Sequence, residues 1–382
     1  MIGRLLPKDN MNLVSYVKEF GEKTFSVEPF NDIDALILSQ MSYINYNLLI
    51  PDMGFVKFKD IQLFDSRDIY IDSADYFNNR TMLKLMMNSA RYKNVKVGYF
   101  RQSFCKRTNK QFVAVTYILP NHNGFIAYRG TDMSMVGWKE DLYIAYRDHI
   151  PGSKDALDYL NDATTLFKGN FYVGGHSKGG NLSVYATLHM PKRLNNRLLK
   201  VYSFDGPGFR TNIQENKNYP YVKDKIQKYL TSNDMIGVIY NNNENAKIVF
   251  SSGVLLGGHD PYRWQIDKKA VDFVYTKDRS YASKQYEEAL MGWLTSMSDE
   301  DKALAVHIIF EMMGESKTVY DLLLNAGRLA ISGRKRWENY SPQQRTQAKE
   351  IFKKLGKYFL SAYSPKRFLS QALIKKKADE EN

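Results

Sequence analysis

The sequence predicts an α/β protein with a mostly parallel sheet flanked by helices and a helical extension at the C-terminus. Between about residues 110 and 252, short β-rich runs alternate with helical runs, as in strand–helix–strand units. After about residue 271 the pattern becomes helical to the end of the chain. We therefore expect one α/β domain over residues 1–270, with a helical segment 1–46 packed on it. Residues 271–382 would form a helical extension or cap.

The N-terminal segment contains one clear helix signal. Asn31 or Asp32 can cap a helix whose apolar face recurs at helical spacing, with Ile33, Leu36, Ile37, Gln40 and Met41 on one side. Residues 47–95 mix charged and aromatic side chains without a clear period, so we assign no element to them.

The middle of the chain supplies the strands and helices of the α/β domain. Runs of β-branched and aromatic residues predict strands at 111–120, 124–130, 170–174, 199–204, 226–232 and 246–252. Helices are expected over 153–167, with Ser153 as a cap, and over 178–190, where Pro191 helps to stop the helix. In the C-terminal part, helix starts are expected at Ser298 with Asp301, at Ser341 with Pro342, and at Ser364 with Pro365.

Composition favours a cytoplasmic protein. Cys105 is the single cysteine, so no intrachain disulfide can form, which fits a reducing compartment. The first twenty residues lack a long apolar run and a small-residue cleavage site, so we expect no signal peptide. No stretch approaches about 18 consecutive apolar residues, so we expect no membrane-spanning helix.

The net charge of +13 does not by itself identify a partner. From Asp301 onward 16 Lys and Arg stand against 9 Asp and Glu, so this part carries +7. We find no recognisable nucleic-acid motif, and we expect a solvated basic surface and no nucleic-acid partner. The alternative is peripheral contact with an anionic membrane through the basic C-terminal helices. There residues 364–377 place Phe368, Leu369, Ala372 and Leu373 among lysines.

A glycine-rich stretch, "VGGHSKGGN" over residues 173–181, contains the candidate catalytic serine. Its core fits the pattern G-x-S-x-G, made by Gly175, His176, Ser177, Lys178 and Gly179. A β-like run precedes it and a helical run follows, the context in which a serine nucleophile sits on a sharp strand-to-helix turn. A phosphate-binding loop would need G-x-x-x-x-G-K-[ST], which the chain lacks. We therefore expect Ser177 to be a nucleophile.

A serine nucleophile needs a base, and His259 is the favoured one among six histidines. It lies in "LLGGHDPY", a loop after the last predicted strand, where the chain order Ser…Asp…His would place it. His176 adjoins the serine and is expected to point elsewhere, and His149 remains a minor candidate. The other three lie in a hairpin-like turn, far along the helix after Ser177, or on an amphipathic C-terminal helix.

The remaining groups of such a site also have candidates. Asp234 and Asp205 both follow predicted strands between the serine and His259. We favour Asp234 as the acid that orients His259, with Asp205 second, because Asp234 lies shortly before the base. Oxyanion donors are expected from the backbone N–H groups of Lys178 and of Thr131 in "AYRGTD".

Taken together these segments resemble a known family. "AYRGTD", "GGHSKGGNL", "YSFDGPGF", "TSNDMIG" and "GGHDPYRW" resemble the class 3 lipase-like branch of α/β-hydrolases. With "FNDIDALILSQMSYINY" near the start, they more closely resemble a bacterial Mbeg-like family of unknown function. The resemblance implies an α/β-hydrolase fold, a Ser177–Asp234–His259 triad, and an oxyanion hole at Thr131 and Lys178. Two departures are Lys178, where those lipases carry leucine, and a short interval between Asp234 and His259.

The expectation is therefore a serine hydrolase of the lipase, lysophospholipase or esterase type, acting on an acyl ester without metal or cofactor. A peptidase or acyltransferase would use the same triad. The rival from another class is a non-catalytic protein of this fold that binds a partner or an anionic membrane surface.

Overall fold

The structure is a computed structural model of the chain. It describes residues 10–363, apart from 53, 65, 67–68, 70–74, 133, 242–244 and 314–335. The chain forms two compact units, Met1–Arg279 and Ser280–Asn382. All residues of the candidate site lie in the first unit.

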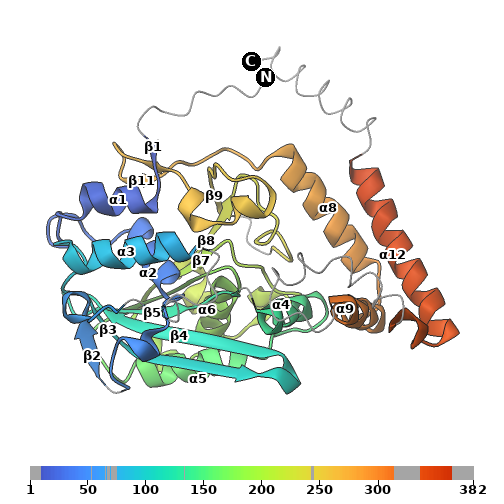
Figure 1. Cartoon of the computed structure of the whole chain (residues 1–382), viewed down its shortest axis with the longest axis horizontal. Helices are drawn as coiled ribbons and strands as arrows, with labels where there is room; N and C mark the ends of the chain where they lie inside the picture. Colours follow the sequence, from blue (N-terminus) through green and yellow to red (C-terminus); the bar gives the residue numbers. More distant parts are fainter. Residues whose placement is uncertain are drawn as a thin grey trace, which may run out of the picture. The chain divides into compact units, whose positions relative to one another are not determined.

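An eight-stranded sheet forms the centre of the first unit (Figure 1). Its strands are neighbours in chain order: β2 (Phe55–Lys57), β3 (Lys96–Cys105), β4 (Lys110–Ile118), β5 (Gly124–Tyr128), β6 (Phe171–His176), β7 (Leu198–Phe204), β8 (Ile226–Thr231) and β9 (Lys247–Val249). Strands β2 to β5 pair antiparallel, and β5 to β9 pair parallel. Because parallel strands end at the same edge, the loops that follow β5 to β9 converge there.

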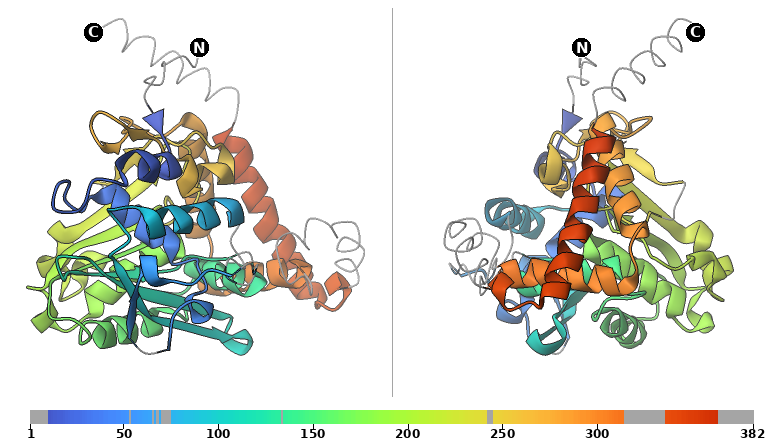
Figure 2. Two further views of the ribbon diagram at one scale, coloured as in Figure 1. Left: turned by 60° about the vertical axis from the view of Figure 1, so that its left-hand side comes forward. Right: turned by 90° about the vertical axis from the view of Figure 1, so that its right-hand side faces the viewer.

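Helices cover both faces of this sheet (Figure 2). The helices of the first unit, in its described residues, are α1 (Leu13–Phe20), α2 (Asp32–Met41), α3 (Tyr76–Asn88), α4 (Met135–Leu142), α5 (Ser153–Ala163), α6 (Lys178–His189) and α7 (Tyr219–Val222). Alternation along β5 shows the two faces. Phe125 belongs to the core cluster that includes α2 residues, whereas Tyr128 donates a hydrogen bond to the carbonyl of Ala156 in α5. The predicted α/β class with helices on both faces is confirmed.

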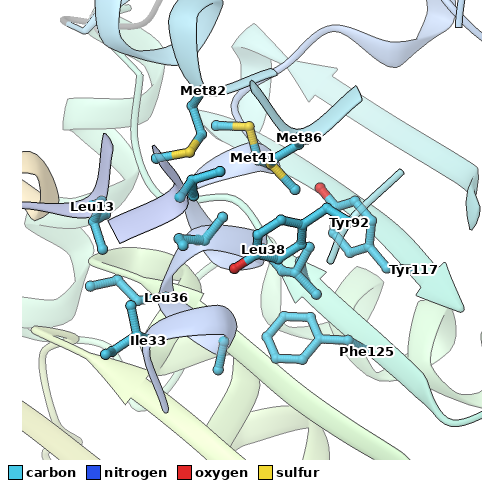
Figure 3. Close-up of a cluster of buried hydrophobic side chains, with 14 of the residues drawn as sticks. Leu13, Ile33, Leu36, Leu38, Met41, Met82, Met86, Tyr92, Tyr117 and Phe125 are labelled. Carbon is cyan, nitrogen blue, oxygen red and sulfur yellow. The ribbon is translucent and has the colours of Figure 1, made fainter. Parts of the chain in front are cut away.

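The core on the α2 face is built from aliphatic, methionine and aromatic side chains (Figure 3). Helix α2 is buried from Ile33 to Met41, and it lies over β5 and β6. Asn31 caps it, accepting hydrogen bonds from Ile33 N and Asp34 N, while the Asp34 carboxylate accepts from Asn31 N. Of the two predicted caps, Asn31 is the residue used.

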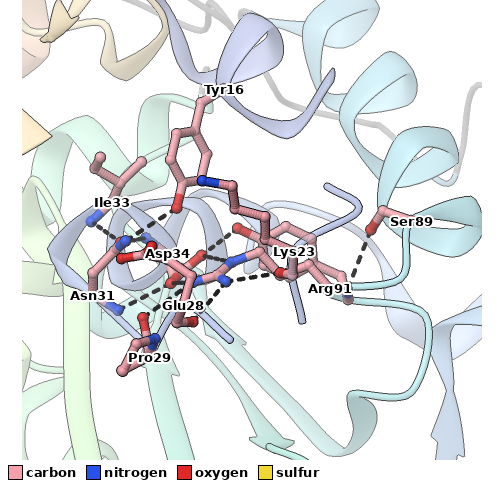
Figure 4. A network of polar contacts seen from close by, with 10 residues as sticks. Tyr16, Lys23, Glu28, Pro29, Asn31, Ile33, Asp34, Ser89 and Arg91 are labelled. Atoms are coloured by element: carbon pink, nitrogen blue, oxygen red, sulfur yellow. Dashed lines mark hydrogen bonds and ion pairs between the residues drawn. The ribbon is translucent and has the colours of Figure 1, made fainter. Parts of the chain in front are cut away.

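A buried ion pair ties this helix to the chain before β3 (Figure 4). Arg91 and Asp34 are both fully buried and pair through two contacts, one of them Arg91 Nε to Asp34 Oδ1 at 2.8 Å. The other Arg91 donors bond the carbonyls of Lys23, Glu28 and Pro29, at 3.0, 2.8 and 3.2 Å. The guanidinium is thus compensated on every side, as a buried charge requires.

A second, smaller sheet lies in the same unit. Strands β1 (Asn10–Met11), β10 (Ile266–Asp267) and β11 (Asp272–Phe273) pair antiparallel, and a further bridge joins Val249 to Tyr275. These pairings keep the chain in the first unit to Arg279, beyond the boundary expected after residue 270.

The described part of the second unit is helical, with α8 (Tyr281–Thr295), α9 (Asp299–Met313) and α12 (Pro342–Ala362). Helix α12 begins as expected, with Ser341 as its cap and Pro342 as its first residue, and Gln344 completes a capping box with Ser341. The expected helix start at Ser364 and the basic run 364–377 lie outside the described residues. No helix in the described ranges is both long and apolar enough to cross a bilayer.

Candidate active site

Ser177 stands at the turn between β6 and α6. Its backbone has φ 58° and ψ −131°, a region that non-glycine residues adopt only when the surroundings impose it. A Cβ on Gly179 would lie 2.1 Å from the carbonyl oxygen of Tyr128, and one on Gly175 would lie 2.4 Å from the Gly179 carbonyl carbon. The glycines therefore allow the turn to pack tightly against the end of β5, as expected of a nucleophile elbow.

His259 follows the single helical turn 255–258 that comes after β9. Its Nδ1 lies 2.6 Å from Oδ2 of Asp205, the residue directly after β7. An ionised Asp205 oxygen can only accept, so Nδ1 carries the proton and Nε2 is left as the basic nitrogen. Burial lowers the pKa of His259, which keeps the ring neutral at neutral pH.

Of the two candidate acids, the structure brings Asp205 and not Asp234 to His259 Nδ1. The sequence favoured Asp234 with Asp205 second, but Asp205 makes the hydrogen bond to His259 Nδ1. Asp234 Oδ1 accepts from the N–H groups of Ile236 and Gly237 at 2.7 and 2.8 Å, and its Oδ2 lies beside Gly237, as does Oδ1 of Asp205. Asp205 has a positive φ of 52°, so the chain turns sharply at the end of β7. The sequence argument relied on the short interval between Asp234 and His259 and gave no sign of this turn.

The side chain of His176, the residue before Ser177, contacts His259. Its Nε2 lies 2.9 Å from the carbonyl oxygen of His259, and the two rings have centroids 4.3 Å apart. Since a carbonyl only accepts, Nε2 must carry the proton of His176. Burial holds the pKa of His176 well below its ordinary value. The neutral His176 side chain thus holds the loop that carries His259. This contact agrees with the expectation that His176 is not the base.

Within the described part of the chain, no hydrogen bond joins the Ser177 hydroxyl to the His259 ring. Because His176 contacts His259 and directly precedes Ser177, the two groups lie at the same sheet edge. Such bonds are often long in a site without substrate and tighten in the substrate complex.

The two expected oxyanion donors also lie at this edge. Lys178 is the first residue of α6, so its N–H has no partner within the helix. Gly130 packs against the elbow, since a Cβ there would lie 2.6 Å from the His176 carbonyl oxygen. The hydroxyl of Thr131 donates to Oδ2 of Asp141 at 2.5 Å. Its only proton is thereby used, and Thr131 is left to offer its backbone N–H.

The Lys178 side chain, to which the sequence assigned no role, closes a buried polar network. Its Nζ lies 2.7 Å from Glu140 Oε2, 3.0 Å from Gln111 O and 3.1 Å from Gln111 Oε1. Lys178 is 1% and Glu140 0% exposed, so this is a fully buried ion pair. Glu140 also accepts from the N–H groups of Gln111 and Gly152, at 3.1 and 2.7 Å. The network ties the start of α6 to β4 and α4, which fixes the residue that follows the serine.

Across the described ranges, no group of three or more His, Cys, Asp or Glu side chains is placed to hold a metal ion.

The sheet order, the helices on both faces and the strained serine at the end of a central parallel strand define an α/β-hydrolase-like fold. The chain belongs to the Mbeg1-like family, whose profile matches residues 86–311. No curated protein matches the sequence.

Three solved lipases resemble the fold. The M37 lipase is 16% identical with a TM-score of 0.35, covering 56% of this chain and 71% of the lipase. The Rhizomucor miehei lipase propeptide complex is 12% identical with a TM-score of 0.36, covering 60% and 68%. Lip2 lipase from Yarrowia lipolytica is 9% identical with a TM-score of 0.34, covering 60% and 82%. At these identities and TM-scores, nothing further about this chain follows from the likeness.

Proposed function

We propose that this protein is a serine hydrolase that cleaves acyl esters. The observation that carries the proposal is the 2.6 Å hydrogen bond between His259 and Asp205, at the sheet edge where Ser177 occupies a strained turn. Oγ of Ser177 attacks the ester carbonyl while Nε2 of His259 takes its proton, and the oxyanion accepts from the N–H groups of Thr131 and Lys178. The alcohol leaves with the proton from His259 and the acyl group stays on Ser177. Water then attacks the acyl group while His259 takes a proton from the water, and His259 returns that proton to Ser177 as the acid leaves.

The substrate class we favour is a lipid or lysophospholipid ester. The support is the likeness of the motifs to class 3 lipases and two exposed apolar side chains in the loop before His259. Val254 is 73% and Leu256 55% exposed there. Peptidase or acyltransferase chemistry would use the same groups, and substrate panels separate these activities. We place the activity in the cytoplasm because the chain has one cysteine. Sedimentation with anionic vesicles tests peripheral membrane contact.

The direct test is covalent labelling by a fluorophosphonate probe, which reacts with activated serines. Wild type should be labelled and Ser177→Ala should not, while Ser252→Ala, an exposed serine in the same loop as His259, should be labelled normally. Nitrophenyl esters of increasing chain length then rank the acyl preference. Equal labelling of wild type and Ser177→Ala would refute the assignment. A folded wild type that binds anionic vesicles but is neither labelled nor hydrolytic would favour the non-catalytic alternative.

A further inference from the structure

Two carboxyl groups, not one, lie behind His259. Asp205 follows β7 and Asp234 lies just after β8, and these strands pair in parallel with Phe204 opposite Tyr229. Both aspartates are fully buried. Two carboxyls that follow neighbouring parallel strands are brought to the same edge of the sheet, so their contact is a direct result of the topology.

One oxygen of each carboxyl, Asp205 Oδ1 and Asp234 Oδ2, faces the same small space beside Gly237. We call these two atoms the inner oxygens and the other two the outer oxygens. A Cβ placed on Gly237 would lie 2.7 Å from Asp205 Oδ1 and 2.8 Å from Asp234 Oδ2. The outer oxygens already have partners, since Asp205 Oδ2 faces His259 Nδ1 and Asp234 Oδ1 accepts from two backbone N–H groups. Two ionised carboxylates would present only acceptors to each other in this space. One proton between the inner oxygens turns the same contact into a hydrogen bond.

The surroundings decide which group keeps that proton. Lys228 and Arg279 act on Asp205 and favour its ionised form. Burial and the neighbouring Asp205 charge raise the pKa of Asp234 well above its ordinary value, whereas that of Asp205 rises to about 6. Like charges in a buried site cannot both persist, so the group with the weaker compensation stays protonated.

We propose that Asp234 is a positioning residue, whose protonated carboxyl donates from Oδ2 to Oδ1 of Asp205 and thereby aims Oδ2 of Asp205 at His259. This role rests on the proposed function. The hydrogen bond holds the Asp205 carboxylate in one orientation and lowers its basicity, so that the proton on His259 Nδ1 stays there when Nε2 becomes charged. Asp234 itself does not exchange a proton during the reaction.

Asp234→Asn is the informative variant because an amide imitates a protonated carboxyl. Its oxygen can accept from Ile236 and Gly237, and its NH₂ can donate to Asp205 Oδ1. We expect the fluorophosphonate labelling rate to stay within about threefold of wild type, the rescue expected of a conservative variant that keeps the donor. Asp234→Val cannot donate and should label about tenfold to a hundredfold more slowly, the cost of a hydrogen bond to a charged group. Asp205→Asn should lose about 10⁴-fold, since the amide favours the wrong tautomer of His259.

The pH profile of labelling separates this role from a merely structural one. If Asp234 is already neutral, Asp234→Asn leaves the acid midpoint, set by His259, within about 0.3 pH units of wild type. If Asp234 is ionised, the substitution removes a negative charge close to His259 and lowers that midpoint by about one unit or more, which would refute the proposal.

An infrared measurement tests the proton without any activity. At pH 8, where Asp141 and Asp205 with pKa values of about 6 are ionised, wild type minus Asp234→Asn should show the carbonyl band of a protonated carboxylic acid. The band should persist in Ser177→Ala. Its absence refutes the proposal even if Ser177 is labelled. Conversely, an unlabelled wild type that shows the band would refute the hydrolase while leaving the shared proton in place.

Discussion

The buried ion pair between Lys178 and Glu140 makes Glu140→Gln the most revealing stability change. Glu140 is fully buried and accepts three hydrogen bonds, from Lys178 Nζ and from two backbone N–H groups. Glutamine has the same shape but one acceptor oxygen and one NH₂ group. Whichever way it turns, its NH₂ meets a donor, and the Lys178 ammonium loses its counter-charge.

The expected loss follows from the burial of the pair. Removing one partner of a buried ion pair costs about 3–5 kcal/mol, because the remaining charge cannot return to water. The carbonyl and amide oxygens of Gln111 still contact Lys178, so we expect the lower part of this range. Adding Lys178→Met should recover part of the loss, since the double variant no longer buries an unpaired ammonium.

Urea unfolding followed by circular dichroism measures these differences, provided that the slopes of the unfolding transitions agree. Asp155→Asn is the matched control. Its partner Lys110 lies on β4 next to Gln111, but the Lys110 and Asp155 side chains are about a quarter exposed, at 22% and 25%, so the loss should stay within about 1 kcal/mol. A loss below about 1 kcal/mol for Glu140→Gln would show that the lysine finds solvent or another partner, and the reasoning would fail.

Three further changes test the site. Gly130→Ala places a Cβ 2.6 Å from the His176 carbonyl, so it should cost about 1–3 kcal/mol in urea unfolding and slow fluorophosphonate labelling; unchanged stability and labelling would contradict the tight packing. His176→Phe keeps a ring but leaves the His259 carbonyl without its donor, which should cost about 1–3 kcal/mol and slow labelling; a labelling rate equal to wild type would show that the loop needs no such anchor. Burial raises the pKa of Asp141 to about 6 from 3.8, so as pH falls the folded protein binds this proton at a higher pH than the unfolded chain does. Wild type should therefore gain stability relative to Asp141→Asn between pH 7 and pH 4, by at most about 3 kcal/mol, and a constant difference would contradict the shift.

Much of the fold could be predicted because local pattern and final structure agree. The strands expected at 226–232 and 199–204 appear as β8 and β7, and the helix expected from residue 178 is α6. The antiparallel strands β2 and β3 were not predicted. Their residues are mixed in character, and β3 is half-exposed over much of its length, so its sequence carries no clean alternation. Ser153 is the first residue of α5 rather than its cap, which is Gly152.

The candidate site shows where sequence reasoning stops. Ser177 and His259 could be found from a motif and from chain order. The choice between Asp205 and Asp234 could not, because both follow strands that end at the same edge, and the sequence does not show which of the two carboxyls contacts His259. Glu140 was missed entirely, since nothing local distinguishes a glutamate that will pair with a lysine 38 residues away.

The ion pair between Arg91 and Asp34 bears on where this protein can be cut. The family profile begins at residue 86, yet Arg91 depends on a carboxylate from a helix that precedes that limit. A protein trimmed to residues 86–311 would leave the Arg91 guanidinium buried without its carboxylate partner. It would also lack α2, so the sheet face that α2 covers would be exposed. It would also stop inside α9. The matched segment therefore marks the part over which related sequences can still be aligned, whereas an expressible fragment would have to keep the N-terminal helices.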